Sequence, residues 1–531
     1  MLALAQTSPT GGDTPMRETL TGLDYLVLAI YMGGLFLLGI VTSGRQTSEE
    51  QYFLSGRKTP SWLAGISVVA TLLSTLTFVS LPGEMIAHGV GLFTSVFAVI
   101  AATIVVSRLI IPVLMRLPVT SVYDYLERRF GLSARSMGAA VFVATRLIWI
   151  GLIIYTASFA VATMTHWDIR WTILVIGLIT TFYTMLGGMQ AVLWSDFAQF
   201  IILAGGTLAV PIVVWLKTDT GPVVWWEAFA STGRASAPIF SLDPTQRLNI
   251  VGVLLFSFLW HLCTHGSDQV AAQRYLSTDS PETARRSLWV FCVGDIGMVL
   301  LLMTCGLALF HYDFTRSGMP LETYSTEVRA VHGDSTAADQ VLPKFIVNVM
   351  PSGLSGLLVA ALLAAAMSSL SSGINSITTV IVTDGVERFG VVRRGGQSLR
   401  LAKILAAVIG LIGIGLAMIV AAMMRGSNWN IVDLMERVNH LFVAPLGALF
   451  LVGILSGRTG LVPALLGFWA GVASGVLVAF SPQIFDLNIS FMWIMPLGFV
   501  ISLGTMLLLA PLFPRPTPKQ LEALRAGSSS S

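Results

Sequence analysis

The feature that most constrains this chain is a series of apolar segments, each about as long as a bilayer is thick. A helix needs roughly 20 mainly apolar residues to cross the hydrocarbon core, and such segments recur from residue 22 to residue 512. Hydrophobic residues make up 54% of the 531 residues and charged residues only 11%. Soluble domains carry nearer a quarter charged residues, so the sequence predicts an all-α polytopic membrane protein.

We expect thirteen spans. Their predicted ranges are 22–43, 62–80, 90–115, 136–163, 171–187, 190–216, 247–266, 286–311, 353–384, 400–424, 431–455, 460–481 and 489–512. Lys and Arg favour cytoplasmic loops. If the N-terminus is outside, the loops assigned to the cytoplasm carry more Lys and Arg than the external loops. Arg274 and Arg285, for example, then share a cytoplasmic loop. The bias predicts an external N-terminus and a cytoplasmic C-terminus, as an odd number of spans requires.

Several function classes find no support in the sequence. The net charge of +3 is too small to indicate nucleic-acid binding. No Walker-type glycine loop is present, which argues against ATP-driven transport. No metal or nucleophile constellation indicates an intramembrane enzyme. We therefore expect a non-enzymatic protein whose partners are the bilayer and a small solute, with no obligate protein partner.

A cluster of hydroxyl groups lies inside one apolar segment. The run AAAMSSLSSGINS, residues 364–376, contains five serines. Ser368, Ser371 and Ser372 fall at i, i+3 and i+4, so they share one helix face, and Ser369 lies on the adjacent face. Neutral hard oxygens suit Na⁺, whereas a softer transition metal would prefer imidazole or thiolate.

The second span is also interrupted by hydroxyl residues. Residues 67–84 read SVVATLLSTLTFVSLPGE, with Thr71, Ser74, Thr75 and Thr77 inside the apolar run. A discontinuous helix with unwound carbonyls facing a cavity is one interpretation. The other is that these hydroxyls bond to their own helix and only bend it.

Two ionisable residues within spans are candidate functional groups, because such residues are costly in a membrane. Arg146 carries a guanidinium fork that matches a carboxylate; a structural ion pair or snorkelling is the alternative. Asp196 is either a group that helps to release a cation inward or a hydrated residue near the interface. His261 and His265 have a metal-chelating spacing, but no third ligand accompanies them, so we favour a packed or cavity-lining role.

Four motifs resemble the sodium/solute symporter family in order and spacing. They are ATLLSTLTF, GGMQAVLWSDFAQ, DQVAAQRYLSTDSPETARRS and the AxxSSxSS pattern, within a resemblance that runs from Asp24 to Pro511. The resemblance implies a LeuT-like core of two inverted five-helix repeats around a midplane site. The implied parts are an extracytoplasmic tail (1–21), an extra first helix (22–43), the repeats (62–216 and 247–455), two further helices (460–512) and a cytoplasmic tail (513–531).

The resemblance also implies ion ligands. The main sodium site would use the backbone carbonyls of Ala70, Leu73 and Ala365 and the hydroxyls of Ser368 and Ser369. A second sodium site, found in some sialic acid transporters of the family, would use Asp196, Ser368, Ser371 and Ser372. The expected coupling ion is therefore Na⁺, with one ion or two.

The implied solute pocket consists of Leu72, Ser74, Thr75, Thr77, Arg146, Thr264 and His265. Sugar-transporting relatives carry Asn, Glu and Gln along the first core helix, and their loss here argues against a hexose. Serine, threonine and the arginine resemble the sialic acid transporters. We therefore expect a sodium symporter of the plasma (inner) membrane that imports a carboxylated solute. A sodium-coupled sugar or amino-acid symporter and a proton-coupled carrier of the same fold are the alternatives.

Overall fold

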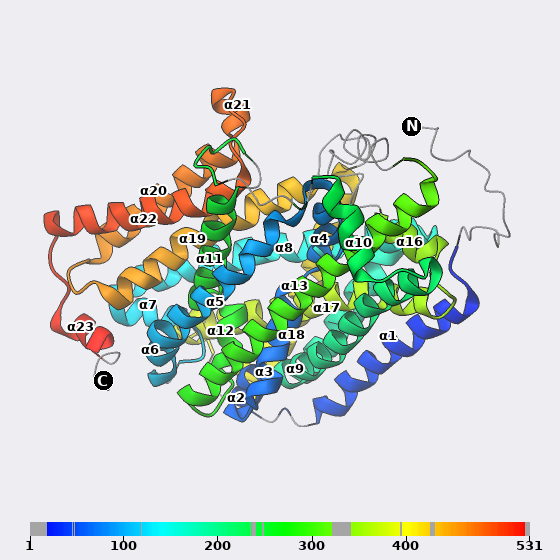
Figure 1. Cartoon of the computed structure of the whole chain (residues 1–531). Helices are drawn as coiled ribbons and strands as arrows, with labels where there is room; N and C mark the ends of the chain where they lie inside the picture. Colours follow the sequence, from blue (N-terminus) through cyan, green and yellow to red (C-terminus); the bar gives the residue numbers. More distant parts are fainter. Residues whose placement is uncertain are drawn as a thin grey trace.

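The computed structural model describes residues 19–525, apart from residues 45, 47, 118, 234, 236–239, 247–248, 321–340, 393–395 and 425–430. Within this part every regular element is helical. Ten of the described helices are long and apolar enough to cross a membrane, and a bent helix pair makes an eleventh. Most of them run roughly side by side (Figure 1).

The helices follow the predicted spans closely. In the first half of the chain they are α1 (Gly22–Ser43), α2 (Glu49–Leu54), α3 (Ser61–Leu72), α4 (Thr75–His88), α5 (Ser95–Val105), α6 (Ile111–Arg116), α7 (Tyr123–Phe130), α8 (Leu132–Thr165), α9 (Ile169–Thr218) and α10 (Pro222–Ser231). In the second half they are α11 (Ile250–Ser267), α12 (Gln269–Leu276), α13 (Pro281–Ser317), α16 (Val341–Asn348), α17 (Leu354–Val380), α18 (Gly396–Met423), α19 (Ile431–Leu455), α20 (Leu461–Ala479), α21 (Ser481–Phe485), α22 (Ile494–Leu509) and α23 (Pro518–Arg525).

Two predicted spans, 171–187 and 190–216, form the single 50-residue element α9. The chain still turns between them, because Gly188 has φ 52° and ψ −148° inside the element. A Cβ atom at Gly188 would lie 2.7 Å from the Tyr52 carbonyl oxygen. Only glycine therefore fits this close approach to α2.

Helix α17, which carries the serine cluster, is the centre of the fold. In its most apolar 18-residue stretch 94% of the residues are buried, against 22% for α1. Helix α17 packs against α9, α8, α1 and α3. The hydroxyl cluster is therefore surrounded by protein and not by lipid.

The N-terminus of α17 is fastened to α1 by a carboxylate. Asp24 Oδ1 accepts hydrogen bonds from the backbone N–H groups of Gly353 (2.7 Å) and Gly356 (2.8 Å). These N–H groups would otherwise lack partners, and the carboxylate suits the positive end of the helix dipole. The close approach needs glycine, since a Cβ at Gly356 would lie 2.6 Å from the Asp24 Cα atom.

Gly356→Ala is therefore expected to lower the melting temperature of the purified protein, with a loss of about 1–3 kcal/mol from overpacking. Gly205→Ala on α9 is the matched control, because nothing lies within 4 Å of the added methyl group. The control should melt at or slightly above the wild-type temperature, since alanine favours helix over glycine. Equal melting of the two variants would contradict the close contact between α1 and α17.

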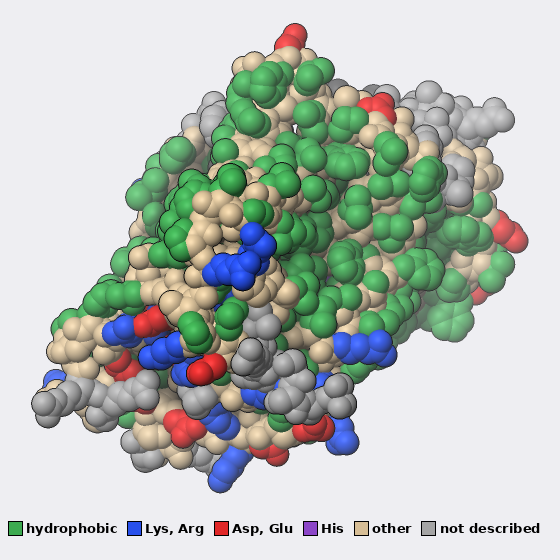
Figure 2. Space-filling model, turned by 90° about the vertical axis from the view of Figure 1, so that its left-hand side faces the viewer, with side chains coloured by type: hydrophobic (Ala, Val, Ile, Leu, Met, Phe, Trp, Pro, Cys, Tyr) green, Lys and Arg blue, Asp and Glu red, His purple; other side chains and the backbone are tan. Residues whose placement is uncertain are grey.

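Charged side chains gather at one end of the molecule, near α7 and α23, whereas hydrophobic side chains cover most of the face in Figure 2. At this end Arg135 on α8 pairs with Asp124, Glu127 and Asp384. The Arg388 guanidinium lowers the pKa of Glu127 to about 2, so this carboxylate stays ionised at neutral pH. The network joins α7, α8 and the end of the α17 segment into one rigid unit.

Candidate functional site

The site begins at a break in the second predicted span. Helix α3 ends at Leu72, Leu73 is extended (φ −78°, ψ 96°), and α4 starts after the N-cap residue Ser74. The two halves meet at 63°. Because the last carbonyls of a helix have no partner within it, the break leaves those of Ala70 and Thr71 available to other ligands.

The serine cluster of α17 reaches these carbonyl groups. Ser368 Oγ donates to the Ala70 carbonyl at 2.7 Å and to that of Ala365 at 3.1 Å. Ser369 Oγ donates to the Thr71 carbonyl at 2.7 Å. All of these groups are buried. Two stretches of chain almost 300 residues apart therefore contribute neutral oxygens to one point.

The chemistry of this donor set fits an alkali cation. Its members are neutral carbonyl and hydroxyl oxygens at a helix C-terminus, where the dipole is negative. Broken helices bind Na⁺ in this way in other transporters. Among the described residues no group of three or more His, Cys, Asp or Glu side chains could hold a metal ion. The oxygens therefore suit a hard monovalent ion better than a transition metal.

One helical turn from these carbonyls lies a buried ionic cluster. Asp196 Oδ2 accepts hydrogen bonds from Ser67 (2.5 Å), Thr71 (3.2 Å) and Arg274 (3.1 Å). The Arg274 guanidinium also donates to the hydroxyls of Ser67 and Thr71, each at 2.9 Å, and to Ser372. The cluster therefore joins α3, α9, α12 and α17.

The position of Arg274 between two predicted spans favours a cytoplasmic loop, and no sequence pattern indicates a functional role for it. The residue is instead 1% exposed, on the short helix α12. Its guanidinium contacts Asp196 and Ser372, two of the predicted ligands of a second sodium ion. In this conformation a cation of the protein itself neutralises Asp196. Ser371, another of those predicted ligands, bonds to the Ser368 carbonyl at 3.1 Å.

Arg274→Gln is expected to lower the melting temperature strongly, because it leaves the Asp196 carboxylate buried without its counter-charge. Breaking one partner of such a pair costs about 3–5 kcal/mol. The double variant Asp196→Asn/Arg274→Gln removes both charges and should regain most of the loss. Melting curves of purified protein in choline buffer would measure both effects. An Arg274→Gln variant that melts like wild type would contradict the pairing.

Arg146 lies at a second break. Its Nη2 atom contacts Asp268 Oδ2, and its guanidinium stacks 4.6 Å from the centre of the Trp149 ring. Asp268 separates α11 from α12 in an extended conformation (φ −92°, ψ 123°), and its Oδ1 accepts from the Val270 N–H at 2.9 Å. Both charged side chains are about 6% exposed. A cavity of about 20 Å³ adjoins the pair.

The other predicted solute ligands divide into two groups. Ser74 and Thr77 bond to each other at 3.3 Å at the start of α4, and the Thr75 hydroxyl donates to the Leu362 carbonyl. Leu72 is the last residue of α3. Thr264 and His265 lie on α11, where the His265 ring faces Tyr275 and Phe291. The structure therefore gathers the first group at the α3–α4 break but places His265 against α12 and α13.

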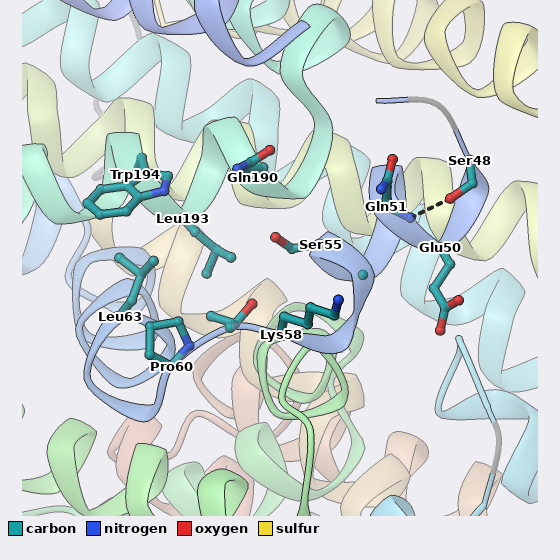
Figure 3. Close-up of a pocket in the computed structure, with 12 residues that line it drawn as sticks. Ser48, Glu50, Gln51, Ser55, Lys58, Pro60, Leu63, Gln190, Leu193 and Trp194 are labelled. Carbon is teal, nitrogen blue, oxygen red and sulfur yellow. Dashed lines mark hydrogen bonds between the residues drawn. The ribbon is translucent and has the colours of Figure 1, made fainter. Parts of the chain in front are cut away.

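A further cavity, of about 740 Å³, opens at the end of the molecule near α2 (Figure 3). Lys58, Gln51 and Ser55 line one side, and Gln190 and Trp194 of α9 line the other. Its other lining residues include none of the predicted ion or solute ligands. Leu63 and Leu193, which also line this cavity, lie about one helical turn before Ser67 and Asp196 of the ionic cluster.

Two broken helices that place carbonyls, hydroxyls and charges inside a bundle of apolar helices define a membrane transporter of the broken-helix class. The sequence profile described as "Sodium:solute symporter family" matches residues 52–471, so this chain belongs to that family. It is a sodium-coupled solute transporter with many membrane spans and not an enzyme.

Known relatives cover nearly the whole chain. The sodium/sialic acid symporters NanT of Aliivibrio fischeri and SiaT of Proteus mirabilis are both 29% identical over 496 residues, which is 92% of this chain and 93% and 95% of theirs. The human sodium-coupled monocarboxylate transporter 1 is 26% identical over 89% of this chain and 76% of its own.

Solved structures agree with this family and fold. A substrate-bound, outward-open Na⁺-coupled sialic acid symporter matches with a TM-score of 0.79 and 26% identity, over 93% of this chain and 99% of that one. Mhp1, a nucleobase-cation-symport-1 family transporter, matches with a TM-score of 0.51 and 12% identity, over 90% of this chain and 98% of its own, which shows the fold alone. The LeuT-like fold expected from the sequence is confirmed.

Proposed function

We propose that this protein uses the sodium gradient to import a small carboxylated solute across the plasma (inner) membrane. The observation that carries the proposal is the contact of the Ser368 and Ser369 hydroxyls with the last carbonyls of α3. Together with Arg146, these groups provide an oxygen site for a cation and a guanidinium for a carboxylate inside the membrane.

The proposed main sodium ligands are the carbonyls of Ala70, Leu73 and Ala365 and the hydroxyls of Ser368 and Ser369. A sodium ion at this point would take over the oxygens that now share hydrogen bonds and would tie the end of α3 to α17 more firmly. Asp196, Ser371 and Ser372 remain proposed ligands of a second ion, which would have to compete with the Arg274 guanidinium.

We place the solute against Arg146, Ser74 and Thr77, with Leu72, Thr75, Thr264 and His265 as further proposed contacts. The relatives named for sialic acid and monocarboxylate transport support an acidic solute. Arg146 fits such a solute, because a guanidinium binds a carboxylate through two parallel hydrogen bonds.

The arrangement of the two broken helices supports the proposed division of the chain. One break, at Leu73, falls in the first helix of residues 62–216, and the other, at Asp268, falls in the first helix of residues 247–455. We propose that these segments are inverted repeats that rock against each other. Residues 22–43 and 460–512 would flank them, with residues 1–21 outside and residues 513–531 inside the cell.

The sodium gradient can drive considerable accumulation. Each charge that moves inward through 100 mV contributes about 2.3 kcal/mol, which corresponds to a ratio of roughly fifty. Uptake into proteoliposomes, with N-acetylneuraminate as the probe, tests the proposal: Na⁺ outside should drive accumulation, and choline should abolish it. Equal uptake in choline with an imposed proton gradient would favour the proton-coupled alternative, and uptake of sugars or neutral amino acids alone would exclude an acidic solute.

A further inference from the structure

We propose that Asp268 selects the solute. Its side chain binds the Arg146 guanidinium as an internal carboxylate until a ligand displaces it. That ligand is a carboxylate with a hydroxyl or ammonium group on the carbon atom next to the carboxylate group. The proposal rests on the function proposed above. It adds a requirement that a lone guanidinium would not impose.

Among the residues that the structure describes, Arg146 has one carboxylate partner, which is Asp268 of the protein itself. The Arg146 guanidinium contacts Asp268 Oδ2 and the face of Trp149, and both charged side chains are buried. A ligand carboxylate that binds the Arg146 guanidinium bidentately uses the Nη2 amino group, which Asp268 Oδ2 now contacts, so the two carboxylates compete for it. The binding site for an anion is already filled by an anion.

Asp268 can release Arg146 and still keep one hydrogen-bond donor for its carboxylate. Its Oδ1 atom accepts from the Val270 N–H at 2.9 Å, as the N-cap of the eight-residue helix α12. A carboxylate at a helix N-terminus is stabilised by the N–H groups and by the dipole. Asp268 can therefore stay ionised after Arg146 turns to a ligand.

The Oδ2 atom, however, then lacks a donor in a buried place. An unsatisfied buried charge is unfavourable, so a ligand that brings a donor for Oδ2 has an advantage over one that does not. Because Oδ2 and the guanidinium are in direct contact, the donor must lie close to the ligand carboxylate. A hydroxyl or ammonium group on the adjacent carbon meets this condition.

The size of the cavity beside Arg146 shows that side chains must move before a solute can bind there. At about 20 Å³ it can hold about one water molecule. Thr145 and Arg146 of α8 line it on one side, and Phe442, Val443 and Leu446 of α19 line it on another. A solute is larger than this cavity, so some of the side chains around Arg146 must move before a solute carboxylate can replace Asp268.

Matched ligand pairs test the proposal by calorimetry and thermal shift in saturating Na⁺. N-acetylneuraminate has a hydroxyl on the carbon next to its carboxylate, and its 2-deoxy analogue lacks it; lactate and propionate form a smaller pair. Wild type should bind the hydroxylated member of each pair at least about tenfold more tightly, the effect expected for one hydrogen bond to a charged group. Equal affinities within the pairs would overturn the proposal without any variant.

Asp268→Asn should reduce the preference to less than about threefold and should strengthen propionate binding, because Arg146 no longer has a competing anion. Asp295→Asn, a buried aspartate on α13, is the control and should keep the wild-type ranking. An unchanged ranking in Asp268→Asn would overturn the role of Asp268 and leave the carboxylate symporter intact. Failure of every carboxylate to bind wild type would overturn both.

Discussion

Ser369→Ala should raise the sodium concentration for half-maximal uptake by about tenfold or more, while the protein remains folded. The substitution removes one proposed oxygen ligand and very little volume. It also removes the hydrogen bond from Ser369 Oγ to the Thr71 carbonyl, which is worth about 1 kcal/mol. Sodium dependence of uptake into proteoliposomes, at a fixed membrane potential, measures the effect.

Ser376→Ala provides the control on the same helix. Its hydroxyl donates to Gln273 Oε1 at 2.9 Å and is equally buried, so the variant loses the same atom and a similar hydrogen bond. Uptake by this variant should keep the wild-type sodium dependence. A sodium dependence that shifts equally in both variants would mean that packing of α17, and not coordination at Ser369, controls the effect.

Arg146→Gln should reduce the affinity for carboxylated solutes at least about a hundredfold. Hydrogen bonds to charged groups contribute about 1.5–3 kcal/mol each, and a bidentate pair loses two of them. The single variant also leaves Asp268 buried without its partner, which costs stability. Solute binding must therefore be compared with melting temperature in the same preparation.

The double variant Arg146→Gln/Asp268→Asn separates binding from folding. It removes both charges of the pair and should melt near the wild-type temperature, yet it should still fail to bind N-acetylneuraminate. Stabilisation by Na⁺ alone should persist, because the proposed sodium ligands are unchanged. Recovery of solute binding in the double variant would exclude Arg146 as the carboxylate ligand.

The sequence was sufficient for the all-helical membrane fold and for the position of the serine cluster on α17. Apolar length located the spans, and the i, i+3, i+4 pattern placed the serines of α17 on adjacent faces. Their meeting with Ala70 depended on the family resemblance, because a contact between residues almost 300 positions apart leaves no local pattern.

The ionic partners could not be predicted in the same way. The sequence predicts a loop at Arg274, because α12 is only eight residues long and has little apolar character. The sequence shows that Arg274 lies near Asp268 along the chain, but the burial of the Arg274 side chain depends on the break between α11 and α12. Likewise, the partner of Arg146 is not an acidic residue of the same span. The partner is Asp268, at the break between α11 and α12. Charge pairs across helices require the tertiary structure.

Equilibrium binding of ²²Na⁺ to purified protein, without any solute, tests the central claim most directly. Wild type should bind the ion saturably, and the double variant Ser368→Ala/Ser369→Ala should show no saturable binding at the main site, whereas Ser376→Ala should bind like wild type. Undiminished ²²Na⁺ binding by a folded Ser368→Ala/Ser369→Ala protein would contradict a sodium site between α3 and α17.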